Sequence, residues 1–102
     1  MRKVTIYSRH TCGGNEYVVP RSGYLIGCGC GVYKLSWRFW YVIDIATGLW
    51  VCGGRTREEA ISKFDSQFKN NLENYRTTHA NDYHEKTERM NALYEDYVKG
   101  AC

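Results

Sequence analysis

The chain changes character at residue 55, and this change limits the folds that are open to it. Nine of the ten glycines and the single proline lie before Arg55, whereas residues 56–99 contain neither. Glycine and proline punctuate strands and turns, and long stretches without them favour helices. We therefore predict one α+β domain over residues 1–102, with a small antiparallel β-sheet in residues 1–55 and two α-helices in residues 56–99.

The strand pattern in residues 1–55 consists of short segments rich in β-branched and aromatic residues. Turn residues separate these segments from one another. The predicted strands are 3–8, 16–19, 23–26, 32–36, 38–43 and 49–52. The last two form a predicted hairpin whose turn lies at 46–48, where Gly48 supplies the positive φ that such a turn needs.

The helical pattern begins at Thr56, where the residues Thr-Arg-Glu-Glu form a capping box. Apolar residues then recur at helical spacing as far as Tyr75, which predicts an amphipathic helix of about five turns that covers the sheet. Polar residues between Thr77 and Asp82 predict a break before a second helix that ends near Lys99. One long, bent helix also fits the absence of glycine and proline.

Four of the five cysteines are each followed directly by glycine. A metal-bound thiolate accepts hydrogen bonds from the backbone N–H groups that follow it, and glycine lets the chain turn tightly enough to deliver them. Four thiolates also make a closed, tetrahedral zinc site. The sequence therefore predicts a structural Zn²⁺ that staples residues 1–55 and is held by Cys12, Cys28, Cys30 and Cys52.

The spacing C-x₁₅-C-x-C-x₂₁-C differs from the usual pair of C-x₂-C knuckles and leaves other interpretations open. His10 lies two residues before Cys12, so a Cys₃His set in which His10 replaces Cys52 is one alternative. The cysteines can also be buried thiols in the core or can form disulfides in a secreted protein. A redox pair is disfavoured because C-x-C is not the C-x-x-C of thioredoxin-like proteins.

The sequence contains no recognisable catalytic motif. It has no H-E-x-x-H, no P-loop and no G-x-S-x-G, and the glycine-rich run at 27–31 precedes a predicted strand, not a helix. We therefore do not expect an enzyme. No apolar stretch approaches the roughly 20 residues of a membrane span, and the polar N-terminus does not resemble a signal peptide, so we expect a cytoplasmic protein.

The charge is divided between the two parts of the chain. Eight basic and two acidic residues give residues 1–57 a charge of +6, whereas six basic and nine acidic residues give residues 58–102 a charge of −3. The first part suits a phosphate backbone and the second a basic protein surface. The run from Trp37 to Tyr41 interleaves aromatics with Arg38, as in a stacking platform for nucleic acid or a protein hot spot. At this chain length, however, we expect both faces of that strand to be covered.

The predicted second helix carries tyrosines and acids that suit a basic groove on a partner protein. The predicted partner-binding residues are Tyr83, Glu88, Tyr94, Glu95, Asp96 and Tyr97. The same surface also suits a homodimer seam, so both monomer and homodimer stay open.

The cysteine–glycine-rich β half, followed by the capped helix that begins in Gly54-Arg55-Thr56-Arg57-Glu58-Glu59-Ala60-Ile61, resembles small phage-encoded proteins. It is most similar to the zinc-containing, type II-A anti-CRISPR proteins. The resemblance implies a protein of the host cytoplasm that inhibits the Cas9 nuclease stoichiometrically by preventing DNA or guide engagement. The acidic residues from Glu58 to Asp96 would face the basic channels of Cas9.

Other features of the chain fit different families. A net charge of +3 departs from the strongly acidic inhibitors that mimic DNA, which favours binding outside the main DNA channel. A fainter resemblance, through the G-x-T-x-E-E-A helix start at Gly54, is to HicB-type antitoxin domains. A small zinc-containing nucleic-acid-binding module and a phage accessory protein are the alternative functions.

Overall fold

The computed structural model describes residues 2–100, so Cys102 lies outside the described residues. The sheet comprises β1 (Lys3–Cys12), β2 (Asn15–Gly27), β3 (Cys30–Ser36), β4 (Phe39–Asp44) and β5 (Leu49–Gly54). The helical part comprises α1 (Arg57–Lys63), the π-helical turn η1 (Phe64–Phe68), α2 (Lys69–Thr78) and α3 (Ala80–Gly100). The predicted α+β class, with an antiparallel sheet followed by helices, is confirmed.

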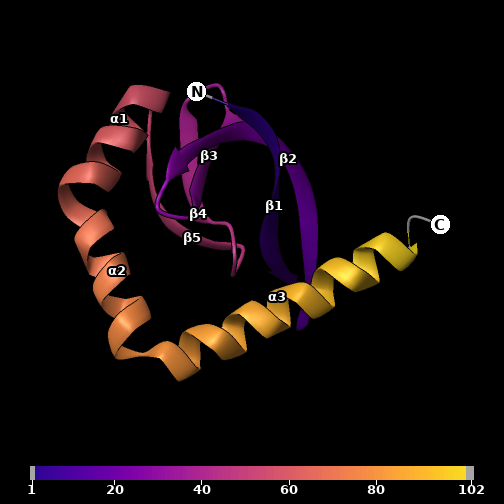
Figure 1. The fold of residues 1–102 in the computed structure, drawn as a ribbon. Coiled ribbons are helices and arrows are strands. Elements are labelled where there is room, and N and C mark those ends of the chain that lie inside the picture. Colours follow the sequence, from indigo (N-terminus) through magenta and orange to yellow (C-terminus); the bar gives the residue numbers. More distant parts are fainter. Residues whose placement is uncertain (1, 101–102) are drawn as a thin grey trace.

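The five strands pair in chain order, and each is antiparallel to the next. The long β1–β2 hairpin curls over one face of the sheet (Figure 1). As a result β1 approaches the turn before β5, where the Arg9 amide donates to the carbonyl oxygen of Gly48 at 2.9 Å. Gly48 has the predicted positive φ, at 69°.

Glycines inside the strands permit close packing and do not mark turns. The segments predicted at 16–19 and 23–26 form one continuous strand, β2, which passes through Gly23. A Cβ atom on Gly23 would lie 2.7 Å from Cδ1 of Ile6, and one on Gly31 would lie 2.5 Å from the same atom. These two glycines therefore let the Ile6 side chain lie directly on the sheet.

The helices follow the capping pattern of the sequence. The Thr56 hydroxyl accepts a hydrogen bond from the Glu59 amide at 3.1 Å, as the capping box predicts. The predicted break between Thr77 and Asp82 occurs at His79, which has φ −117° and ψ 47°. The bent column of α1 and α2 flanks the sheet, and α3 crosses its lower end at an angle (Figure 1). No helix in residues 2–100 has the length and apolarity needed to cross a bilayer.

The core has three parts. The first lies between the sheet and α1 and comprises Cys30, Val32, Val42, Cys52, Ala60 and Phe64. The second lies on the other sheet face, where β1 curls over, and comprises Ile6, Tyr33 and Ile43. The third seats α3 and comprises Val18, Met90 and Leu93. Each face of the sheet is therefore covered over part of its area, and Trp37, Phe39 and Trp50 remain exposed.

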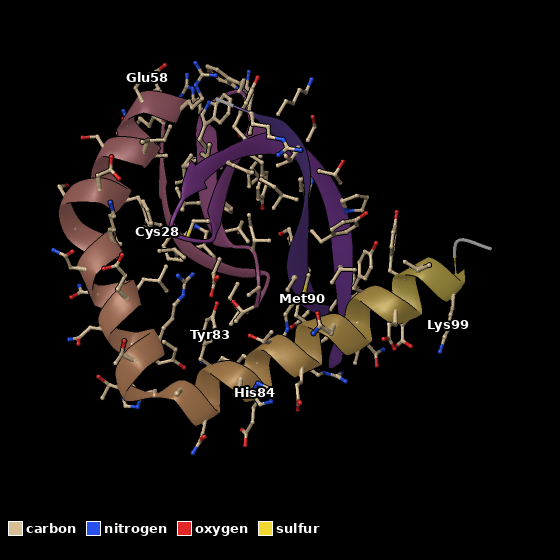
Figure 2. All side chains as sticks on the ribbon, in the orientation of Figure 1. Cys28, Glu58, Tyr83, His84, Met90 and Lys99 are labelled. Atoms are coloured by element: carbon tan, nitrogen blue, oxygen red, sulfur yellow. The ribbon has the colours of Figure 1, made fainter. Side chains whose placement is uncertain are left out.

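A buried ion pair ties the helical bend to the sheet. The Arg76 guanidinium donates to Asp44 Oδ1 at 2.9 Å and to the Cys28 carbonyl oxygen at 2.6 Å. The Tyr83 hydroxyl donates to the same Asp44 oxygen at 3.2 Å. Figure 2 shows Tyr83 pointing toward the sheet and His84 pointing away from it. These contacts fix the angle between α2 and α3.

Candidate functional site

The structure separates two of the predicted zinc ligands widely. Cys12 is exposed at the end of β1, and Cys28 lies in the turn between β2 and β3. The 13 residues of β2 lie between these two turns. At about 3.3 Å per residue, that strand has a contour length of about 40 Å. Cys12 and Cys28 therefore lie beyond opposite ends of β2.

The other two predicted ligands lie in the core. Cys30 and Cys52 are fully buried beneath α1, and the Cys52 thiol donates to the Ala60 carbonyl oxygen at 3.9 Å. Burial raises the pKa of the Cys30 thiol to about 12 and that of the Cys52 thiol to about 11. Both side chains therefore act as small, neutral core residues in this arrangement, which was one of the alternatives that the sequence left open.

His10, the alternative ligand, has other partners. Its Nε2 lies 2.8 Å from the Ser8 hydroxyl, and its ring stacks on Tyr17 at a centroid distance of 5.7 Å. Among residues 2–100, no three or more His, Cys, Asp and Glu side chains come together as a metal site. As arranged here, the predicted ligands do not fit one zinc ion, and the zinc site stays a prediction from sequence.

Large aromatic side chains are exposed at the β4–β5 end of the sheet. The exposed fraction is 72% for Trp37, 58% for Trp50 and 52% for Phe39. The expectation that both faces of this strand are covered is therefore wrong. Trp40 has the opposite orientation and packs against the core beneath α1, as the predicted alternation requires. One face of β4 thus fills the core while the other presents aromatic rings to solvent.

Two hollows lie along these aromatic rings. One hollow of about 410 Å³ is lined by Phe39, Tyr41, Trp50, Cys52, Gly53, Gly54, Arg55, Glu59, Lys63 and Phe68. A second hollow of about 330 Å³ is lined by Trp37, Arg38, Phe39 and Arg55. Because the two hollows share Phe39 and Arg55, they adjoin each other, and we call the two together the groove. Its larger part has the size of an ordinary small-molecule site.

Basic side chains accompany the rings along this groove. The Arg38 guanidinium lies over the Trp37 ring, 3.9 Å from its centroid. Within residues 2–100, Arg38, Arg55 and Lys63 make no ion pair. Among the described residues that line the groove, Glu59 is the single acid. We define the aromatic–basic surface as Trp37, Arg38, Phe39, Tyr41, Trp50, Arg55 and Lys63.

Three local features of the chain build this surface. The β3–β4 turn projects Trp37 and Arg38 from the end of the sheet. A bulge in β5 shifts its pairing, so that Trp50 lies opposite Ile43 and its ring meets Tyr41 at a centroid distance of 6.1 Å. The π-helical turn η1 directs Phe68 toward the groove, whereas Phe64 remains in the core.

The predicted partner-binding residues of α3 fall into two groups. Glu88, Glu95 and Asp96 are exposed, with the Glu88 carboxylate 3.0 Å from His84 Nε2. Tyr94 and Tyr97 are partly exposed, and both rings pack edge-on against Tyr7 of β1, with centroids at 4.8 and 5.8 Å. Tyr83 stands apart from the other five because it turns inward to Asp44. The structure therefore presents an acidic outer face on α3 without Tyr83.

Comparison of this chain with known protein families, curated proteins and solved structures finds no match. Its function is therefore argued from the geometry of its surface. The sequence pattern singled out Arg38 but missed Trp50, Lys63 and Phe68 as parts of the same site. One signal could have pointed to Trp50. It lies in a predicted strand that forms a hairpin with the aromatic-rich segment 38–43. The position of Phe68 depends on the π-helical turn, which helical spacing does not reveal, whereas Lys63 is the last residue of α1.

Proposed function

We propose that this protein binds nucleic acid through the aromatic–basic surface. The observation that carries the proposal is that Trp37, Phe39 and Trp50 are each more than half exposed beside cations that make no ion pair within residues 2–100. Nucleobases stack on aromatic rings, and Lys and Arg side chains neutralise the phosphates between them. Both kinds of contact are available in one groove.

The exposure of these rings has an energetic cost that a ligand would recover. Covering a large apolar side chain is worth about 1.5–3 kcal/mol, and this chain leaves three such rings uncovered at one end of the sheet. Contiguous exposed apolar surface is typical of binding sites. A ligand that stacks on the rings would gain that free energy on binding.

The charges around the rings favour a polyanion over an ordinary protein partner. Three cations and a single acid line the groove. Residues 1–57, which form the sheet and the start of α1, carry a net charge of +6. A surface of this sign attracts phosphate over several ångströms and repels other basic surfaces.

The test is fluorescence anisotropy with a labelled oligonucleotide over a range of salt concentrations. For single strands, three phosphate contacts give a slope of log K against log salt of about −2. The Arg55→Gln variant is expected to lower the affinity and to reduce that slope by about 0.7. Lys99→Gln makes the same change of charge at the far end of α3 and should match the wild-type protein. Failure to bind any oligonucleotide at low salt would rule the proposal out.

A second candidate function is stoichiometric inhibition of the Cas9 nuclease. The acidic outer face of α3 favours it, since Glu88, Glu95 and Asp96 are exposed next to the partly exposed rings of Tyr94 and Tyr97. Acids beside tyrosines suit a basic channel on a partner protein, because the charges steer the encounter and the rings supply buried contact area.

This second candidate is tested by adding the protein to Cas9 in equimolar amount before the target DNA. Inhibition predicts that target cleavage stops and that reversing charge with Glu95→Lys and Asp96→Lys restores it. Asp65→Lys, an exposed acid of η1 on the other helical column, is the matched control and should still inhibit. Undiminished cleavage with the unmodified protein would remove this candidate.

A further inference from the structure

The floor of the groove is glycine at the position where a side chain would block it. Gly53 of β5 lies directly opposite Tyr41 of β4. A Cβ atom on Gly53 would lie 3.2 Å from Cδ1 of Tyr41 and 3.1 Å from the Trp40 carbonyl oxygen. Gly53 is not among the residues with positive φ, so backbone conformation does not require glycine here. The close approach of the Tyr41 ring and the Trp40 carbonyl oxygen favours glycine instead, and Gly53 lines the hollow beside that ring.

The rings that line the hollow beside Gly53 stand at an angle to one another and do not form a flat platform, and we call this hollow the slot. Trp50 meets Tyr41 at an interplanar angle of 73°, and Phe39 lines the same hollow two residues before Tyr41 on β4. A hollow of about 410 Å³ lies in the range of sites that hold a single small molecule. A flat unpaired base with its sugar suits such a hollow. The bases of a duplex do not enter it, because they are stacked on each other and offer only their edges.

The cations flank this slot on two sides. Arg55 and Lys63 line the same hollow as Gly53, whereas Arg38 lines the adjoining hollow beside Trp37. A strand that placed one base over Gly53 would therefore carry its next phosphates past Arg55 and toward Arg38. The stacked Arg38–Trp37 pair offers a cation and a ring to the neighbouring nucleotide.

We infer that the ligand is a single-stranded nucleic acid, DNA or RNA, which inserts an unpaired base over Gly53 against Tyr41 and Trp50. The flanking phosphates then contact Arg55 and Lys63 on one side and Arg38 on the other. This inference rests on the proposed function and narrows it, because a contact made by charge alone would hold a duplex as well as a single strand.

The experiment compares three labelled probes against the full chain at one low salt concentration. The probes are a single-stranded DNA of about 10 nucleotides, within the usual span of a single-strand site, an RNA of the same sequence, and a hairpin duplex of the same composition. We expect at least one single strand to bind about tenfold or more tightly than the duplex, as the loss of one stacked base predicts. Quenching of tryptophan fluorescence should accompany single-strand binding. The comparison of the DNA and RNA probes shows which of the two nucleic acids is the ligand.

Variants of the slot separate stacking from charge. Trp50→Ala removes a wall and Gly53→Leu fills the floor, so each should weaken single-strand binding about tenfold and leave duplex binding unchanged. Tyr17→Ala removes a ring that is 45% exposed on β2, outside the groove, and should change neither. Circular dichroism checks the fold, and Gly53→Ala replaces Gly53→Leu if the larger side chain prevents folding.

The outcomes distinguish this inference from the function on which it rests. Two results would contradict the insertion of an unpaired base but leave nucleic-acid binding intact. In the first, the duplex binds as tightly as both single strands, and in the second, Trp50→Ala binds single strands like the wild-type protein. If no probe binds, both fail together. Preferential single-strand binding that Trp50→Ala and Gly53→Leu weaken, and that Tyr17→Ala leaves intact, supports the inference.

Discussion

Aromatic side chains have different roles in two regions of this protein. Between α3 and β1, the rings of Tyr94 and Tyr97 pack edge-on against the Tyr7 ring and hold the helix on the sheet. At the β4–β5 end, the rings of Trp37 and Trp50 are mostly exposed to solvent. The same residue class therefore works as packing in one region and as available surface in the other.

Charged residues differ between the same two regions. Near α3, Arg76 pairs with Asp44, and Arg9 pairs with Glu16 at 2.5 Å. In the aromatic–basic surface, Arg55 has no ion-pair partner within residues 2–100. Paired charges lock the geometry of their own chain, whereas solvated charges remain free for a ligand. Substitutions in the packed region should therefore change stability, and substitutions in the exposed region should change affinity.

The largest effect is expected at the Arg76–Asp44 pair. Arg76→Leu leaves the Asp44 carboxylate, which is 4% exposed, without its cation in the interior. We expect the free energy of unfolding to fall by about 3 kcal/mol, because an uncompensated buried charge is costly. Denaturant unfolding measures it. Arg55→Leu, the same change in the exposed region, should stay within about 0.5 kcal/mol of the wild type. Similar losses of stability in both variants would show that Arg55 also contributes to packing.

Trp37→Ala is expected to have the converse effect. The side chain is 72% exposed and carries the stacked Arg38, so its loss should leave the unfolding free energy within about 0.5 kcal/mol. Affinity for a single-stranded oligonucleotide should fall by about 1–3 kcal/mol, since one stacking surface is gone. Anisotropy titration and thermal unfolding of the same sample provide the two readings. A loss of stability without a loss of affinity would place Trp37 with the packing residues.

A smaller effect is expected from pH. Burial, and secondly the charge of Arg21, hold the pKa of His10 below its usual value of 6.5. The unfolded chain therefore takes up this proton at a higher pH than the folded protein does, so stability is full above about pH 6.5 and falls as the pH drops below it. Unfolding at several values between pH 5 and 8 measures the slope. His10→Gln should flatten it, and an unchanged slope would assign the effect to another group.

The smallest effect is expected from Cys12→Ser. Cys12 is exposed at the end of β1, so the structure predicts a change of less than about 0.5 kcal/mol in the unfolding free energy. Cys30→Ser, in the core, should cost about 1–3 kcal/mol, because it buries a hydroxyl in apolar surroundings. If both variants lose comparable stability together with one equivalent of zinc by atomic emission, the four-thiolate site predicted from sequence is present.

Much of the fold follows from local signals in the sequence. The Thr56 cap, the positive φ at Gly48 and the break at His79 each depend on a few neighbouring residues, and each is where the sequence predicts it. The gap predicted at 20–22, which contains Pro20, was wrong because β2 continues through these residues and pairs there with residues of β1 that are distant in the sequence. Contacts between distant residues carry no local signal, so the extent of β2 could not be predicted in the same way.

The candidate site was predictable only in part for the same reason. The alternation in β4 correctly places Phe39 and Tyr41 on the face opposite Trp40, whereas Trp37 and Arg38 lie in the turn before β4. Whether that face is covered depends on where β1 curls and on where the helices lie, and neither follows from periodicity. Glycine follows the cysteines for different structural reasons. Gly13 and Gly29 have positive φ in turns, whereas Gly53 lies in a strand.

The number of residues in the π-helical turn at Phe64–Phe68 determines how α2 is oriented relative to the sheet. Each helical residue advances the chain by about 100° around the axis, so deleting one residue in this turn would rotate all of α2 by that angle. Arg76 would then swing away from Asp44, and Phe68 would leave the groove. Divergent copies of this chain are therefore expected to vary the exposed residues Asp65, Ser66 and Gln67 while keeping the number of residues in this segment unchanged.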